Sequence, residues 1–290
     1  MSGPADGPAA PGRAAPAPGG PAAPVPRGQR LAWYTAAALS AVLVVAAAGW
    51  QVRADIGART RTVTGGSAGR AVTAVEVVGG EADVTVTPRG DQEVGYRAAL
   101  TWTFKEPFVE ESWLGDTLKL SPRCPGEGIG VAIGTGCSVR LAVTVPTGIP
   151  VRVSGGSGRV TVSGLAGAVD ADMGSGNLVL ADLRGPLRAR VGSGTLRATG
   201  LTAPDTDVRA DTGHAEVTFA APPDRVTGHV GAGRLEIGLP TATRYRVSCR
   251  AGAGRCETED ALRDPSATRV LDLEAGAGHA SAGYRRASAP

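Results

Sequence analysis

The sequence predicts an all-β protein, a β-solenoid built of 18–24-residue repeats and preceded by one transmembrane helix. Three observations lead to this prediction: a recurring glycine turn, apolar columns on both sides of it, and one charge-free run near the N-terminus. The turns are Gly156-Ser157-Gly158, Gly174-Ser175-Gly176, Gly192-Ser193-Gly194, Asp211-Thr212-Gly213, Gly231-Ala232-Gly233, Gly252-Ala253-Gly254 and Gly276-Ala277-Gly278. Their last glycines are 18, 18, 19, 20, 21 and 24 residues apart, which is typical of a repeat protein.

The residues around each turn alternate between apolar and polar. Apolar or small residues stand two positions after the last glycine: Val160, Leu178, Leu196, Ala215, Leu235, Cys256 and Ala280. Because a strand turns alternate side chains to opposite faces, this column faces inward and its polar neighbours face outward. Each repeat is therefore expected to be a strand, a tight turn and a second strand. Glycine suits such a turn because it adopts positive φ without steric cost.

Stacking these repeats rung on rung would bury a continuous narrow core over residues 151–285, as in a β-solenoid. The alternative is a meander of antiparallel hairpins in which each glycine element is a hairpin loop. The alignment of like residues in columns favours stacked rungs.

The N-terminal part differs in composition. Residues 1–30 are rich in Pro, Ala and Gly, which predicts a disordered cytoplasmic tail. Residues 31–50 carry no charge and are long enough to cross a bilayer as a helix, with Trp33 and Trp50 near the two interfaces. A cleaved signal peptide is the alternative, since Ala46-Ala47-Ala48 resembles a cleavage site.

Two further regions connect this helix to the repeats. Residues 51–70 are polar and are expected to form a linker; the G-x-S-x-G pattern at 65–69 lacks the strand and helix that give it meaning in hydrolases. Residues 71–150 are β-rich but irregular, and 75–87 could be a degenerate first repeat. Five of the eleven aromatic residues fall in this region, namely Tyr96, Trp102, Phe104, Phe108 and Trp113. They are expected to cap the open end of the stack, with a carbohydrate-binding surface as the alternative.

The four cysteines fall into two pairs. Cys124 and Cys137 bracket a glycine-rich loop, and Cys249 and Cys256 lie in inward columns on either side of one turn. Both pairs are expected to form disulfides, which indicates an oxidising compartment. Unpaired thiols are the alternative, and zinc is disfavoured because no histidine lies close to either pair. The protein is thus expected in the cell membrane, single-pass, with most of the chain extracellular.

The stretch from Val109-Glu110-Glu111-Ser112-Trp113 through Cys124-Pro125 and Cys137-Ser138-Val139 to the Gly-Ser-Gly repeats resembles the bacterial "putative adhesin" family of unknown function. The resemblance covers roughly residues 72–283. It implies a β-solenoid of the cell envelope, often attached to a membrane segment, and some relatives are associated with envelope-stress responses. It supplies no catalytic residues, and the pair Cys249 and Cys256 is not a feature of the family.

No catalytic, cofactor or metal site is expected. Asp170, Asp172 and Asp182 are the best acidic group, but they occupy surface positions of ordinary strands. His214 and His279 share the column directly after the turn, yet stacking in sequence order would place them three rungs apart. The net charge of +3 gives no indication of nucleic-acid binding.

One outward column is basic. Four residues before the last glycine come Arg190, Arg209, His229 and Arg250, which stacking in sequence order would place on consecutive rungs. Like charges about 5 Å apart repel unless a counter-charge neutralises them. The hypothesis is that this row binds an anionic envelope polymer, such as a teichoic-type polymer, or anionic lipid headgroups, with Arg favoured for bidentate phosphate contacts.

These patterns together predict a non-enzymatic binding, adhesion or scaffold module of the bacterial envelope. The alternative is an envelope-stress protein that signals to a protein partner through its cytoplasmic tail.

Overall fold

The computed structural model describes residues 37–45, 58–125 and 136–285. The chain divides into two compact units, Met1–Arg53 and Ala54–Pro290. In the first unit, residues 37–45 form a helix. Across the described ranges, no helix is both long and apolar enough to cross a membrane. The two ends of the predicted 31–50 span and the predicted 1–30 tail lie outside the described residues.

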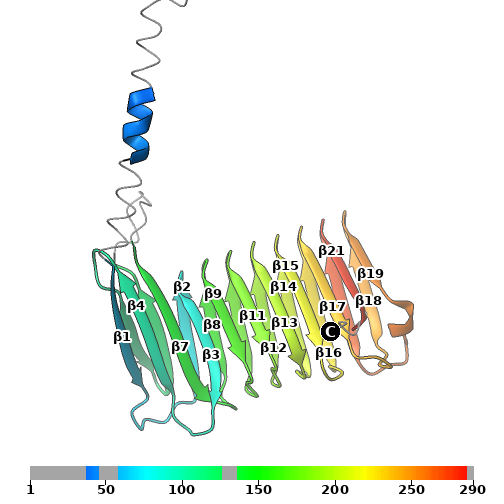
Figure 1. Cartoon of the computed structure of the whole chain (residues 1–290). Helices are drawn as coiled ribbons and strands as arrows, with labels where there is room; N and C mark the ends of the chain where they lie inside the picture. Colours follow the sequence, from blue (N-terminus) through cyan, green and yellow to red (C-terminus); the bar gives the residue numbers. More distant parts are fainter. Residues whose placement is uncertain (1–36, 46–57, 126–135, 286–290) are drawn as a thin grey trace, which may run out of the picture. The chain divides into compact units, whose positions relative to one another are not determined.

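The second unit is built from two sheets of 11 and 10 strands, as far as it is described (Figure 1). We call them the first sheet and the second sheet. The first has the order β1-β4-β7-β3-β9-β11-β13-β15-β17-β21-β19, and the second the order β18-β20-β16-β14-β12-β10-β8-β2-β6-β5. Most neighbouring strands are parallel, so the predicted all-β fold with stacked parallel strands is confirmed.

Each glycine turn connects a strand of the second sheet to a strand of the first sheet, and we call this unit a rung. The strands before the turns are β8 (Val151–Gly155), β10 (Val169–Met173), β12 (Leu187–Val191), β14 (Asp205–Ala210), β16 (Arg225–Val230), β18 (Arg246–Ala251) and β20 (Val270–Ala275). The strands after the turns are β9 (Arg159–Ser163), β11 (Asn177–Ala181), β13 (Thr195–Leu201), β15 (His214–Phe219), β17 (Arg234–Leu239), β19 (Arg255–Thr258) and β21 (His279–Tyr284).

The hairpin alternative is wrong, because the two strands of a rung do not pair with each other. Instead, β10 pairs in parallel with β8 and β12, and β11 pairs in parallel with β9 and β13. The inward column lies between the sheets as predicted: Val160, Leu178, Leu196, Ala215, Leu235 and Ala280 are at most 1% exposed. Burial of this apolar column is the main force that holds the two sheets together.

The last glycine of each turn is required for a different reason from the one predicted. Positive φ occurs at other glycines among the described residues, such as Gly164 and Gly200, and not at the turn-ending ones. The stacked turns approach so closely that a Cβ on Gly194 would lie 2.0 Å from the carbonyl oxygen of Gly176, and one on Gly233 would lie 1.8 Å from that of Gly213. Only glycine leaves room for the next turn.

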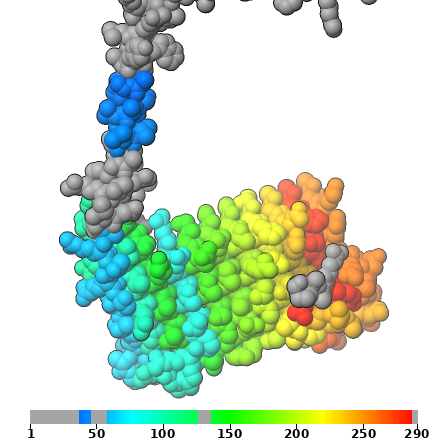
Figure 2. Space-filling view, viewed as in Figure 1, coloured from blue at the N-terminus to red at the C-terminus, as the bar shows by residue number. Residues whose placement is uncertain are grey.

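The last rung of the chain is inserted out of sequence order. Strands β20 and β21 lie between the β16/β17 rung and the β18/β19 rung, so that the C-terminal strands, red in Figure 1, separate yellow strands from orange ones. The space-filling view shows the same succession of coloured bands along the surface (Figure 2). The prediction that rungs stack in sequence order is wrong at this end.

The insertion separates four pairs of similar side chains that sequence order would make neighbours. Val270 lies between Arg225 and Arg246, Glu274 between His229 and Arg250, His279 between Arg234 and Arg255, and Ser281 between Glu236 and Glu257. Like charges directly opposite on neighbouring strands destabilise a sheet, each by up to about 1 kcal/mol. The charge pattern therefore favours the observed order over the sequential one.

The N-terminal strands complete the other end of the stack. Strands β2 (Ala74–Gly80) and β3 (Asp83–Arg89) pair in parallel with β8 and β9, which confirms a degenerate first repeat. The end strands are β1 (Arg59–Gly66), β4 (Gly95–Trp102), β5 (Phe108–Leu114), β6 (Thr117–Arg123) and β7 (Ser138–Pro146). Here β1, β4 and β5 pair antiparallel to their neighbours, which ends the parallel stack.

Strand β1 lies inside the region predicted to be a linker. Its residues alternate Arg and Thr from Arg59 to Thr62 and are exposed, so it has no apolar face that periodicity could detect. The aromatic cap is confirmed for Tyr96 and Trp102, which are buried, but not for Phe104 and Phe108, which are 67% and 51% exposed. The Tyr96 hydroxyl donates to a Glu111 carboxylate oxygen, and burial together with this contact raises the pKa of Tyr96.

Both predicted disulfides are present, one at each end of the stack. The Cys124–Cys137 bond joins the segment after β6 to the segment before β7, and the Cys249–Cys256 bond joins β18 to β19. Each bond therefore connects the second sheet to the first sheet. The described residues contain no free cysteine. The Cys249–Cys256 bond lies in the last rung, which no further rung covers, whereas β6 and β7 each have a paired strand on both sides.

The steric role of the turn glycines can be tested with Gly194→Ala. The added methyl group would meet a backbone carbonyl that cannot rotate away, so we expect a loss of about 1–3 kcal/mol in the free energy of unfolding, measured by urea denaturation. The control is Gly148→Ala, whose Cβ would meet nothing within 4 Å and should change stability by less than about 0.5 kcal/mol. Equal effects of the two changes would contradict the close stacking of turns.

The β18/β19 end also buries one tyrosine. Tyr245 precedes β18, is fully buried, and is held by its backbone: its N–H donates to the Leu262 carbonyl at 2.8 Å. Its hydroxyl has no hydrogen-bond partner among the described residues. Burial raises the pKa of Tyr245 to about 12, with Asp224 adding to the shift and Arg269 opposing it.

We predict that Tyr245→Phe stabilises the fold by about 1 kcal/mol, because it removes a buried hydroxyl without a partner. Between pH 10 and 12 the unfolded wild-type chain loses this proton while the folded chain keeps it, so stability falls as pH rises. The variant should show a shallower fall, measured by urea denaturation across this range. If the variant is less stable than wild type, and its stability falls as steeply between pH 10 and 12, the hydroxyl has a hydrogen-bond partner and the prediction is wrong.

Candidate functional site

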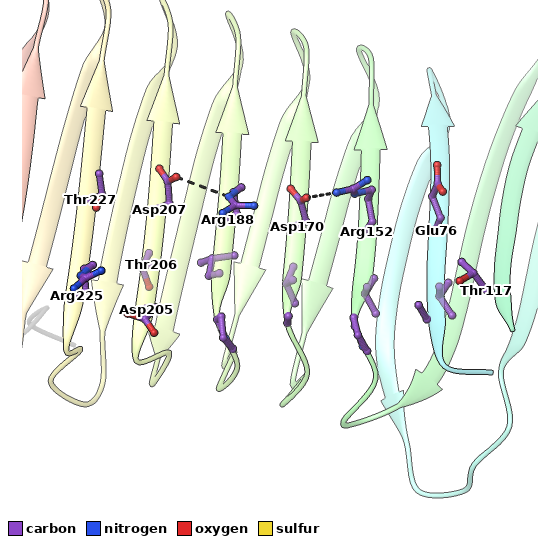
Figure 3. A pocket seen from close by; sticks show the side chains of 18 residues that line it. Glu76, Thr117, Arg152, Asp170, Arg188, Asp205, Thr206, Asp207, Arg225 and Thr227 are labelled. Carbon is purple, nitrogen blue, oxygen red and sulfur yellow. Dashed lines mark hydrogen bonds and ion pairs between the residues drawn. The ribbon is translucent and has the colours of Figure 1, made fainter. Parts of the chain in front are cut away.

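The outer face of the second sheet carries a row of alternating charges that crosses its strands. Register places Lys119, Glu76, Arg152, Asp170, Arg188 and Asp207 on successive strands (Figure 3 labels the last five). Ion pairs connect Lys119 to Glu76 at 3.0 Å, Arg152 to Asp170 at 2.8 Å and Arg188 to Asp207 at 3.8 Å. Opposite charges on neighbouring strands stabilise the sheet and neutralise one another.

Sequence reasoning missed this row although the repeats contain its signature. Arg152, Asp170, Arg188 and Asp207 each stand six residues before the last glycine of their repeat, so an alignment of that column would have shown the alternation. The sequence predicts only that Asp170 occupies a surface position of an ordinary strand. In the structure it is the partner of Arg152, and this ion pair raises the pKa of the Arg152 guanidinium.

A shallow groove of about 710 Å³ runs beside the alternating row. Its other side is formed by small or apolar residues at the start of the strands, among them Pro150, Ala168 and Pro186. The charged side chains that line it are residues of the row together with Asp205 and Arg225, which are in register on β14 and β16 (Figure 3). The charges of the row are paired with one another, and Asp205 and Arg225 stand opposite each other on neighbouring strands, so the groove presents no set of charges of one sign.

The predicted basic row is only partly brought together. Arg190, Arg209 and His229 lie on consecutive strands β12, β14 and β16, as predicted. The inserted strand β20 then places Glu274 between His229 and Arg250, so the expectation of four consecutive basic residues is wrong at Arg250. The physical reason is the rung order, in which β18 is two strands away from β16.

Acidic side chains lie within contact distance of only some residues of this row. Arg209 contacts the Asp207 carboxylate at 3.3 Å, and the Nδ1 atom of His229 lies 3.7 Å from a Glu274 oxygen. Arg190 and Arg250 are exposed and form no ion pair within the described ranges, although Asp172 and Glu274 stand opposite them on neighbouring strands. Two of the four predicted residues therefore keep their charge available to a ligand.

The remaining candidates are dispersed. Asp172 lies in register with Ser154 and Arg190, and Asp182 lies in the loop after β11. His214 and His279 are two strands apart, with Arg234 between them, and not three rungs apart as predicted. In the described part of the chain, no three His, Cys, Asp or Glu side chains are grouped to hold a metal ion.

No protein-family model and no curated protein matches the sequence. Several solved structures are similar. A "putative lipid binding protein" from Parabacteroides distasonis is 15% identical, with a TM-score of 0.45, covering 79% of this chain and 98% of the other. A "putative adhesin" from Parabacteroides merdae is 16% identical, with a TM-score of 0.44 and coverages of 78% and 96%. A "putative cell adhesion protein" from Clostridium sporogenes is 12% identical, with a TM-score of 0.37, covering 79% of this chain and all of the other.

Proposed function

We propose that this protein is a non-enzymatic binding module of the bacterial cell envelope that recognises an anionic polymer or lipid surface. The observation that carries the proposal is the row Arg190, Arg209 and His229 on three consecutive parallel strands. Parallel strands about 4.8 Å apart hold these side chains at fixed spacing, so a ligand meets them without ordering a flexible loop.

Two features support a location outside the cytoplasm. The disulfides join the two sheets at both ends of the stack, and disulfides persist mainly in oxidising compartments. The charge-free run 31–50 supports attachment to a membrane through the N-terminal segment. The folded unit would then be displayed outside the membrane, where envelope polymers and lipid headgroups lie.

The chemistry of the row favours anions with two accessible oxygens. Guanidinium groups donate paired N–H groups that match phosphate or carboxylate oxygens. On the same face, the neighbouring Arg residues of the alternating row are committed to carboxylates. Binding would therefore concentrate near Arg190, whose guanidinium forms no ion pair in the described residues although Asp172 stands opposite it on β10.

The proposal is tested by co-sedimentation of the unit Ala54–Pro290 with purified cell wall and with anionic vesicles, at low and high salt. The protein should begin before Arg59, because a later start would remove part of β1. Binding at low salt that is lost at high salt is expected, since exposed charge contacts are screened. No binding to either material at low salt would contradict the proposed function.

The contribution of the row is tested with Arg190→Glu plus Arg209→Glu. Each arginine that contacts an anion contributes a charge-assisted hydrogen bond, so the double change should weaken binding by about tenfold or more. A matched control reverses Arg140 and Arg159, two exposed arginines near the opposite end of the stack, with the same change in net charge. If both double variants lose binding equally, the row has no special role.

A further inference from the structure

The glycine turns of successive rungs form a continuous edge of the stack, the upper edge in Figure 3. We call the C-terminal part of this edge the glycine ridge. It consists of Gly192-Ser193-Gly194, Asp211-Thr212-Gly213, Gly231-Ala232-Gly233, Gly276-Ala277-Gly278 and Gly252-Ala253-Gly254. The predicted row with Arg190, Arg209 and His229 stands just before these turns and forms one flank of the ridge.

A second row stands on the other flank, directly after the turns. His214, Arg234, His279 and Arg255 occupy consecutive strands β15, β17, β21 and β19 in matching register. In this row the inserted last rung places His279 between the two arginines. Every position in it bears a cationic or N–H-donating side chain.

The second flank row borders a trough about 880 Å³ in volume that follows the ridge. The turns line the trough with small residues, and the hydroxyls of Ser193 and Thr212 also face it. The Thr212 hydroxyl donates to the Ser193 oxygen at 2.9 Å. The trough is therefore a long, open site with basic residues along its length and little side-chain bulk.

The neighbouring charges leave part of this row unneutralised. Arg234 contacts the Glu236 carboxylate at 3.3 Å, while Arg255 has no acidic partner in the part of the chain that the structure describes. The next outward row on the first sheet is Arg197, Glu216, Glu236, Ser281 and Glu257. Those carboxylates lie about 7 Å further along the strands, away from the ridge.

We propose that a linear polyanion with regularly repeated phosphate groups binds along the glycine ridge and contacts both flank rows. This deepens the proposed function and rests on it. The two sheets are about 10 Å apart, so flexible arginine side chains from both flanks can reach a chain lying on the ridge. The ends of the first flank row, Arg190 and Arg250, are four strand spacings apart, or about 19 Å. The ridge therefore matches an extended polymer better than a small anion.

The shape of the ridge gives a second reason, besides the close stacking of the turns, why the turns contain no large residues. The middle residue of each turn is Ser, Thr or Ala, and Ala232, Ala253 and Ala277 occupy three of the four rungs where the second flank carries Arg or His. A larger side chain at these positions would stand between the two rows. A polymer could then contact one flank only.

The test is calorimetric titration of the full chain, in detergent, with long-chain inorganic polyphosphate and with triphosphate at low salt. The variant Arg234→Glu plus Arg255→Glu should weaken polyphosphate binding by about tenfold or more, while the Arg140 and Arg159 control should leave it within about twofold. Long-chain polyphosphate should bind more tightly per molecule than triphosphate, because it spans several rungs. The variant Arg234→Lys plus Arg255→Lys, which keeps the charge, should retain most of the binding.

Four outcomes would overturn the inference. If wild-type protein binds cell wall in a salt-sensitive way but the Arg234 and Arg255 variant binds as well as wild type, the ridge is not the site and the proposed function stands. If triphosphate binds as tightly as the long polymer, the site is not an extended one. If the unit Ala54–Pro290 binds anionic vesicles but not polyphosphate, the ligand is a lipid surface. Absence of binding to every anion tested would remove the proposed function as well.

Discussion

The fold depends on how closely one glycine turn lies on the next. At Gly176, Gly194, Gly233 and Gly254, an added Cβ would lie about 2 Å from the carbonyl oxygen of the neighbouring turn. This contact keeps every rung at the same spacing, which in turn aligns the side chains of each column across the strands. Buried columns then form a continuous core, and exposed columns form rows of charge. The rows are therefore a direct consequence of the turn packing.

The insertion of the last rung determines what those rows present to a ligand. On the second sheet it introduces Glu274 into the predicted basic row, and on the first sheet it places His279 between two arginines. The first row is weakened, whereas the second keeps its four basic residues and changes only their order. The same insertion separates like charges that sequential stacking would oppose. The order of the final rungs therefore affects both the stability of the stack and the charges that its edge presents.

The repeat period, the inward column and both disulfide pairs could be predicted from the sequence, because each depends on local spacing that a single chain displays. The order of the last two rungs could not, since β18 and β20 present similar inward columns and local patterns do not state which one neighbours β16. Strand β1 was missed because its Arg and Thr residues have no apolar face. The sequence suggests that the turn glycines are needed for their backbone conformation, but their role is to leave room for the turn of the neighbouring rung. This contact joins residues of different repeats, so the sequence of a single repeat does not reveal it.

The most direct test of this account is a pair of engineered cross-links on the outer face of the second sheet. In the observed order Thr227 is in register with Asp272, and Asp272 with Ser248, so Thr227 and Ser248 are two strands, or about 10 Å, apart. We expect Thr227→Cys with Asp272→Cys to form a disulfide under mild oxidation, mapped by peptide mass spectrometry, and Thr227→Cys with Ser248→Cys not to form one. The opposite result would show that the rungs stack in sequence order. The second flank row would then have the order His214, Arg234, Arg255 and His279, with its two arginines adjacent.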